Sequence, residues 1–407
     1  MPRRSEESGQ CFPTRAIGLR VRRVFAGPGA LLLAVALLGA GCGGGGGGDE
    51  SSAEPIKIVV EGPISGDQAA TGKDMANAAR LAVDQANAAG GVLGRKIELI
   101  EGDDQADPAV GKRVAQQAVD DGAFAVIGPY NSSVGIENLK TYVDAGIIPI
   151  HLTSSAATDG LGYTVQPKDY QVAPVEAAAI SGYVKARRVA IVYDTSSYTA
   201  GIADQLKTAL ENYGVKVVLY QSFAADKLDA AAVVKKIAAA KPDLFYVGTY
   251  FPEGGKIAKE ADAQGLDATC LAGLANQDPK FVEIAGLHAA ERCYSSGVPS
   301  PDQFAGATDY VTDYRQKFGV APGTWGTFTY DSVDLLFSAV RAAGAWDADA
   351  VRAQLSKTTS YAGATGGITI VPKTGNRKVV PVVILDINQQ GAYVVDRKWA
   401  KFAGFAL

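Results

Sequence analysis

The sequence predicts an α/β protein made of two similar lobes, each built on a doubly wound parallel sheet. Short runs rich in valine and isoleucine are nearly continuous rather than alternating, which is typical of parallel strands covered on both faces. Helical patterns separate these runs, and glycine or proline stands at most of their ends. The same texture recurs in both halves of the chain, which implies repeated βα units.

The expected elements follow the chain in order. Strands are predicted at 56–60, 96–100, 123–128, 146–150, 188–193, 216–220 and 244–248. Helices are predicted between them, at 73–91, 108–122, 198–214 and 230–242, and again at 330–346. The segments "VVPVVILDI" and "GAYVV" near the C-terminus predict a hairpin that turns at "NQQG".

The first 41 residues have the features of an export signal, with arginines ahead of an apolar run. Small residues then precede Cys42, which resembles the lipobox of bacterial lipoproteins, although the usual leucine is Gly39 here. An uncleaved signal anchor is the alternative. The glycine-rich stretch 42–54 favours a flexible tether for a lipid-anchored domain. We therefore expect an exported protein, anchored at the outer face of the cytoplasmic membrane or in the periplasm.

Composition narrows the function further. The formal charge is −4 and no basic patch occurs, so the sequence does not indicate a nucleic-acid partner. Behind the leader lie Cys270 and Cys293, in a compartment where oxidation is permitted. They form either a disulfide or two buried thiols on neighbouring strands, and the sequence leaves both open.

The glycine-rich segment "GPISGDQAATGKDM" (62–75) has the look of a phosphate loop. Five residues separate Gly66 from Gly72, one more than a Walker A loop allows, and Asp74 stands where a hydroxyl is needed. We therefore expect a turn between strand and helix, with Thr71 as the helix N-cap.

Enzyme motifs are scarce in this sequence. His151 and His288 have no metal-ligand neighbours, and no nucleophile motif is present. The pair Asp103–Asp104 at a strand end fits a solvated turn better than a cleft. We expect no catalytic residue, no metal and no cofactor.

Two loops rich in serine and threonine are more informative. "IGPYNSSVG" and "PIHLTSSAATDG" leave the carboxyl ends of adjacent predicted strands, where open α/β sheets bind ligands. Helix capping is the alternative role, but hydroxyls and free backbone N–H groups there also suit a carboxylate. Equivalent loops in the second half offer Tyr198, Tyr250 and Glu253. A zwitterion held between two lobes would need this division, with anion-binding donors on one lobe and aromatic and acidic groups on the other.

Four blocks resemble the periplasmic leucine/isoleucine/valine-binding protein family, in consistent order from about Ile56 to the C-terminus. They are "GPISGDQAATGKDM", "AGGVLGRKIELIEGDDQADP", "VIGPYNSSVG" and "GTYFPEGGKIAKEADAQGL". The resemblance implies a type I periplasmic-binding fold, in which a hinge of three crossovers lets two lobes close on a ligand. It implies one lobe of residues 55–172 plus 299–377 and another of 173–298 plus 378–407. It also implies a monomer that delivers an amino acid, of the branched-chain type, to an ABC permease.

The same resemblance assigns roles to single residues. It implies that the ligand carboxylate is held by Ser132, Thr153 and Ser155. Tyr198 and Tyr250 would close over it from the second lobe. Thr71 lies where relatives often carry a tyrosine or tryptophan, and Trp325 lies near a ligand-facing aromatic position.

One departure from the family concerns the ligand ammonium. The acid that pairs with it in relatives aligns, without a gap, to Leu274. Either Asp278 or Glu253 takes its place, or the pocket accepts a non-amino carboxylate, an aromatic acid or an amide. An exported enzyme or a sensory lobe is the remaining alternative. The former lacks a nucleophile–base arrangement, and the latter lacks a second membrane segment after Cys42.

Overall fold

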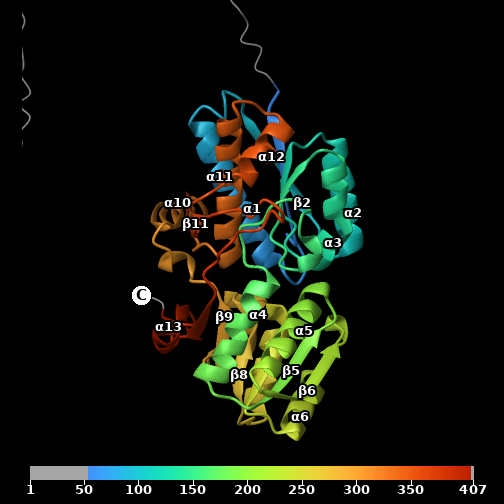
Figure 1. Ribbon diagram of the computed structural model, residues 1–407, viewed down its shortest axis with the longest axis vertical. Helices are drawn as coiled ribbons and strands as arrows, with labels where there is room; N and C mark the ends of the chain where they lie inside the picture. Colours follow the sequence, from blue (N-terminus) through green and yellow to red (C-terminus); the bar gives the residue numbers. More distant parts are fainter. Residues whose placement is uncertain (1–53, 405–407) are drawn as a thin grey trace, which may run out of the picture. The chain divides into compact units, whose positions relative to one another are not determined.

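The computed structural model describes residues 54–404, and within this range the first sheet has four parallel strands (Figure 1). Their order is β2-β1-β3-β4, with bounds of Ile56–Gly62 for β1, Ile97–Asp103 for β2, Ala125–Ile127 for β3 and Ile148–Ile150 for β4. Helices α1 (Ala69–Ala88), α2 (Pro108–Asp120) and α3 (Ser132–Asp144) follow the first three strands.

Strand β1 is buried on both faces, as the continuous apolar run predicts. Ile58 and Val60 join a cluster with Met75 of α1 and Phe328 of α11 (Thr324–Ala343). Val59 points the other way and joins a cluster with α2 and α3 residues. Successive side chains of a strand alternate between its faces, so helices cover both sides of this sheet.

The second sheet has the order β13-β12-β9-β8-β7-β5-β6 within the described part of the chain. The parallel strands are β5 (Arg188–Asp194), β6 (Lys216–Phe223), β7 (Leu244–Gly248), β8 (Thr269–Ala272) and β9 (Cys293–Gly297). The antiparallel strands are β12 (Val383–Ile387) and β13 (Tyr393–Val395). The predicted C-terminal hairpin is therefore confirmed, and it makes one edge of this sheet antiparallel.

The remaining elements complete the two lobes. The second sheet is accompanied by α4 (Asp169–Ala178), α5 (Ser197–Asn212), α6 (Ala230–Ala240), α7 (Phe251–Ala263), α8 (Pro279–Ala285), α9 (Leu287–Ala290) and α13 (Arg397–Ala403). Between β9 and β12 the chain forms α10 (Thr308–Phe318), α11, α12 (Ala348–Ser356) and the hairpin β10 (Tyr361–Gly363) to β11 (Gly366–Ile368). In the described residues the chain passes between the lobes before α4, after β9 and before β12. The predicted fold class, with its three crossovers, is confirmed.

The glycine-rich segment 62–75 has a packing role at the start of α1. Helix α1 already begins at Ala69, because the N–H groups of Thr71 and Gly72 donate to the carbonyl of Gln68. The prediction of Thr71 as N-cap is therefore wrong. A Cβ added at Gly72 would lie 2.2 Å from the carbonyl oxygen of Pro63, so glycine is required for α1 to pack on this loop.

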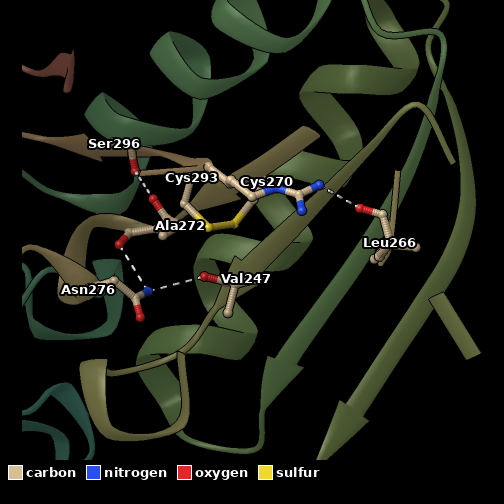
Figure 2. Close-up of a disulfide and its surroundings, with 9 residues drawn as sticks. Val247, Leu266, Cys270, Ala272, Asn276, Cys293 and Ser296 are labelled. Carbon is tan, nitrogen blue, oxygen red and sulfur yellow. Dashed lines mark hydrogen bonds between the residues drawn. A yellow bond between two sulfur atoms is a disulfide. The ribbon is translucent and has the colours of Figure 1, made fainter. Parts of the chain in front are cut away.

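Cys270 and Cys293 are opposite each other on β8 and β9, and a disulfide joins them (Figure 2). Of the two arrangements that the sequence leaves open, a disulfide and two buried thiols, the structure has the disulfide. At the other end of β8, the amide of Asn276 donates to the carbonyls of Val247 and Gly273. These bonds fix the loop that follows β8, which reaches the pocket described next.

Candidate ligand-binding site

A small pocket lies where loops from both sheets meet. The first lobe supplies the loops after β3 and β4, and the second supplies those after β5, β7 and β8. The lining residues are Tyr130, Ser132, Leu152, Ser154, Gln166, Tyr198, Tyr250, Leu274, Ala275 and Trp325. The carboxyl ends of parallel strands are where ligands of open α/β sheets bind.

Aromatic rings form much of the wall. The ring of Tyr130 lies 5.5 Å from that of Trp325 and 6.0 Å from that of Tyr250, centre to centre. Tyr198 lies 5.4 Å from Tyr250 and receives the N–H of Ala275 on its hydroxyl at 3.3 Å. The pocket is therefore largely apolar, with a few hydroxyl and amide groups.

Four of the residues predicted for the site line this pocket, namely Ser132, Tyr198, Tyr250 and Trp325. Ser155 lies just behind it, since its N–H donates to Ser132 Oγ at 3.3 Å and its own hydroxyl accepts from Ala157. The lining residues that the sequence did not single out include Tyr130, Ser154 and Gln166. For Tyr130 and Ser154 the available signal was their place in the two serine loops, whereas Gln166 lies outside both loops.

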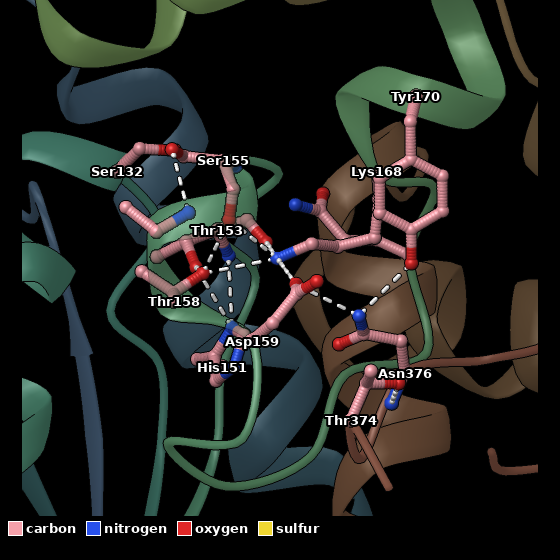
Figure 3. A network of polar contacts seen from close by, with 12 residues as sticks. Ser132, His151, Thr153, Ser155, Thr158, Asp159, Lys168, Tyr170, Thr374 and Asn376 are labelled. Carbon is pink, nitrogen blue, oxygen red and sulfur yellow. Dashed lines mark hydrogen bonds and ion pairs between the residues drawn. The ribbon is translucent and has the colours of Figure 1, made fainter.

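Thr153 and the second serine loop belong to a buried polar network (Figure 3). Thr153 Oγ1 lies 2.9 Å from Nδ1 of His151 and 2.7 Å from Oγ1 of Thr158. The side chain of Lys168 reaches this network from the start of α4 and is fully buried. Thr153 therefore holds the loop in shape, and it does not line the pocket.

Asp278 serves as the N-cap of α8. Its Oδ1 accepts the N–H of Lys280 at 2.8 Å, and its Oδ2 accepts the hydroxyl of Thr71 from the other lobe at 3.2 Å. Neither Asp278 nor Thr71 lines the pocket. Glu253 lies in the first turn of α7, 3.9 Å from Lys256, and burial raises the pKa of its carboxyl to about 7.

Leu274 does line the pocket, so the position expected for an acid presents an apolar side chain there. A different acid lies close by. Asp169, the first residue of α4, is 1% exposed, and neither carboxylate oxygen accepts a hydrogen bond within residues 54–404. Its N–H donates to the carbonyl of Ser154. Its Oδ2 lies near Gly201 of α5, where an added Cβ would be 3.4 Å away.

The charge of Asp169 reaches the pocket tyrosines. Burial raises the pKa of Asp169 to about 6, and its negative charge, second to burial, raises the pKa of Tyr198. Unsatisfied buried carboxylates are rare in native proteins and call for an explanation. Residue type did not single out Asp169, because an aspartate at a helix start ordinarily indicates a cap.

The pair Asp103–Asp104 is divided between two environments. Asp103 is partly exposed and accepts the N–H of Ser65, as a solvated turn requires. Asp104 is fully buried, so for it the solvated-turn prediction is wrong. It is packed near Glu61, whose carboxylate accepts hydrogen bonds from Asn138 and Tyr142.

The histidines do not form a catalytic or metal site. His151 is buried in the network of Figure 3, and exposed His288 lies 2.8 Å from Asp262. Residues 54–404 contain no group of three side chains that could hold a metal ion.

Comparisons with known proteins agree with this architecture. A family model described as periplasmic binding protein matches residues 55–392, and the chain belongs to that family. An amino acid binding protein of Pseudomonas aeruginosa is 31% identical over 349 residues, covering 83% of this chain and 91% of that protein. The Leu/Ile/Val-binding protein homolog 2 of Brucella abortus is 30% identical over 336 residues, covering 81% and 90%.

A solved structure extends the likeness to three dimensions. It is the branched-chain amino acid transporter substrate binding protein LivJ of Streptococcus pneumoniae, in complex with isoleucine. It is 27% identical and has a TM-score of 0.77, covering 84% of this chain and 99% of that chain. The predicted type I periplasmic-binding fold is therefore confirmed. In the described range, no helix is both long and apolar enough to cross a membrane.

Proposed function

We propose that this protein is an extracytoplasmic solute-binding lipoprotein that captures an aliphatic amino acid of the branched-chain type and delivers it to an ABC permease. The names of the relatives and the isoleucine-bound LivJ structure support this class of ligand.

The observation that carries the proposal is the pairing of hydroxyl donors with an unsatisfied acid. Ser132 and Ser154 line one side of the pocket, and Asp169 lies behind Ser154 without lining the pocket itself. The Ser154 hydroxyl is near enough to lower the pKa of the Asp169 carboxyl, but no close hydrogen bond reaches either carboxylate oxygen in the described residues. An α-carboxylate would accept from the serines, and an α-ammonium would pair with Asp169. A buried charge needs such a partner, and this arrangement gives one to both ends of a zwitterion.

The remaining assignments are part of the same proposal. The ligand is enclosed by Tyr198, Tyr250 and Trp325, the lobes divide near residues 172, 298 and 377, and the protein acts as a monomer without catalysis. Cys42, the residue proposed to be acylated, lies outside the described residues. Blocking acylation by Cys42→Ser should release the protein from the membrane fraction, and continued membrane association with unchanged mobility would contradict a lipid anchor.

A second candidate is a receptor for a non-amino carboxylate, an aromatic acid or an amide. The apolar Leu274 in the pocket wall favours it, because a ligand without an ammonium would need no acid there.

Calorimetric titration separates the two candidates. Leucine and its keto acid, 4-methyl-2-oxopentanoate, share the side chain and the carboxylate and differ at the α-carbon, where a ketone replaces the ammonium group, so they form a matched pair. We expect leucine to bind about a hundredfold more tightly, as pairing of a buried charge predicts. Tighter binding of the keto acid, or of benzoate, would favour the second candidate. Recovery of the ligand unchanged would distinguish a receptor from an exported enzyme.

A further inference from the structure

Lys168 lies directly behind the second serine loop, on the side away from the pocket (Figure 3). It precedes α4 at the first crossover, and its side chain is 0% exposed. A buried ammonium is costly unless it is paired and hydrogen-bonded, so its contacts indicate what it is for.

Lys168 contacts two backbone carbonyls and two side chains of the loop. Its Nζ donates to the carbonyl oxygen of Ser155 at 2.7 Å and to that of Thr153 at 3.4 Å. It also donates to Oγ1 of Thr158 at 3.0 Å and pairs with Oδ1 of Asp159 at 3.1 Å. Asp159 is 26% exposed, so solvent screens this anion more than the buried ammonium.

The carbonyl contacts fix the direction of two peptide groups. In a trans peptide the C=O and N–H bonds point in opposite directions. Because the carbonyls of Thr153 and Ser155 point toward Lys168, the N–H groups of Ser154 and Ala156 point away from it. Ser154 lines the pocket, so its peptide group presents its positive end on the side where a ligand carboxylate would lie.

The same loop also orients a pocket hydroxyl. Ser155 N–H donates to Ser132 Oγ at 3.3 Å, so that oxygen acts as an acceptor there and its own proton remains for a ligand acceptor. Figure 3 shows Ser132 and Ser155 on one side of the network and Lys168 on the other. The ammonium thus lies behind a set of donors that faces the pocket.

We propose that Lys168 is a positioning residue that makes the pocket selective for carboxylates over neutral amides. It orients the peptide groups of the loop 153–156, and its charge attracts a ligand carboxylate through them. This inference rests on the proposed function, since it takes the loop to be the carboxylate site.

The test compares leucine with leucinamide, which keeps the ammonium and the side chain but lacks the carboxylate. The charge of Lys168 also lowers the pKa of Asp169, so the calorimetric titration is made at about pH 8, where that carboxylate is ionised. There Lys168→Met should show leucine binding about tenfold or more weakened, with leucinamide not weakened by more than about threefold. A purely structural role would weaken both ligands equally, and that result would overturn the proposal. Lys140→Met, which removes an exposed lysine paired with Asp144, is the matched control and should leave both affinities unchanged.

A second variant keeps the proposal testable if Lys168→Met does not fold. Asp159→Asn removes the anion that partly neutralises Lys168, so the preference for leucine over leucinamide should rise about threefold. An unchanged or reduced preference would overturn the proposal.

The proposed function can fail separately. If wild-type protein binds another carboxylate instead of leucine, that compound and its amide become the pair, and Lys168 is tested on them. If it binds no carboxylate at all, both proposals are wrong.

Discussion

Asp278 and Asp169 are both buried aspartates at helix N-termini, but their carboxylates differ in the hydrogen bonds that they accept. Both oxygens of Asp278 accept hydrogen bonds, from Lys280 N–H and from the hydroxyl of Thr71. Neither oxygen of Asp169 accepts one in the described residues. A satisfied carboxylate stabilises the fold, whereas an unsatisfied one costs folding free energy. This difference supports the proposal that Asp169, and not Asp278, pairs with the ligand ammonium.

The largest expected effect comes from Asp169→Asn. Loss of the charge should weaken leucine binding about a hundredfold or more, because the ligand ammonium would be buried without a counterion. Binding of the keto acid should not weaken. Calorimetric titration of both ligands checks this, with Asp278→Asn as the matched control. An equal loss of leucine affinity in both variants would contradict the assignment of different roles to Asp169 and Asp278.

Asp169→Asn should also raise the melting temperature of the ligand-free protein. Burial raises the pKa of Asp169 above its ordinary value, so the native state binds a proton more readily than the unfolded chain. The contribution of the Asp169 carboxyl to the free energy of unfolding is therefore present at low pH and is lost as pH rises toward about 6. A neutral amide removes that loss, and an unchanged melting temperature at neutral pH would contradict the assignment.

The next effect is the pH dependence of binding. Burial raises the pKa of Asp169 to about 6, while the nearby Ser154 hydroxyl and the charge of Lys168 lower it and the charge of Asp159 raises it. An ammonium ligand needs the ionised carboxylate, so leucine affinity should be about tenfold lower at about pH 5 than at about pH 8. Titrations across this range should show the fall in wild type and none in Asp169→Asn. A flat wild-type profile would contradict the role of Asp169.

A smaller effect is expected at Asp278. Asp278→Ala removes the cap of α8 and should lower the free energy of unfolding by about 1 kcal/mol. Leucine affinity should change less than about threefold, since Asp278 does not line the pocket. Denaturant unfolding and calorimetry together test this. A hundredfold loss of affinity would instead make Asp278 the ammonium partner.

The smallest effect is expected for Thr71→Val, which removes one hydrogen bond between the lobes and keeps the α8 cap. Unfolding free energy should fall by about 0.5–1 kcal/mol, measured in the same denaturant experiment. Asp278→Ala removes this hydrogen bond together with the cap, so a loss as large as that of Asp278→Ala would show that the interlobe bond, not the cap, is what Asp278 mainly supplies.

Much of the fold could be predicted because burial on both faces leaves a clear sequence signal. Strand β1 and strand β5 are continuous apolar runs, and both were expected. Strands β8 and β9 were not among the strands predicted from apolar runs, since they contain cysteine or serine, although strands at the two cysteines were one alternative. Pairing with β7 and β12, which a local pattern does not record, makes them strands.

The site was predictable only in part for a similar reason. The serine loops and tyrosines lie at strand ends, so topology places Ser132 and Tyr198 at the pocket. The role of Asp169 depends on whether other groups satisfy its oxygens, which is decided by tertiary packing. The burial of Asp104 beside Glu61 likewise depends on how α2 and α3 meet. Residue type and spacing carry no record of either.

The position of Trp325 makes the protein its own optical reporter. Of the three tryptophans in the chain, Trp325 lines the pocket, while Trp346 packs on Phe124 and Trp399 on Tyr183. A ligand that displaces water from the pocket changes the surroundings of one indole ring and leaves the other two as a constant background. Intrinsic fluorescence should therefore follow occupancy without a label, and Trp325→Phe should silence the signal.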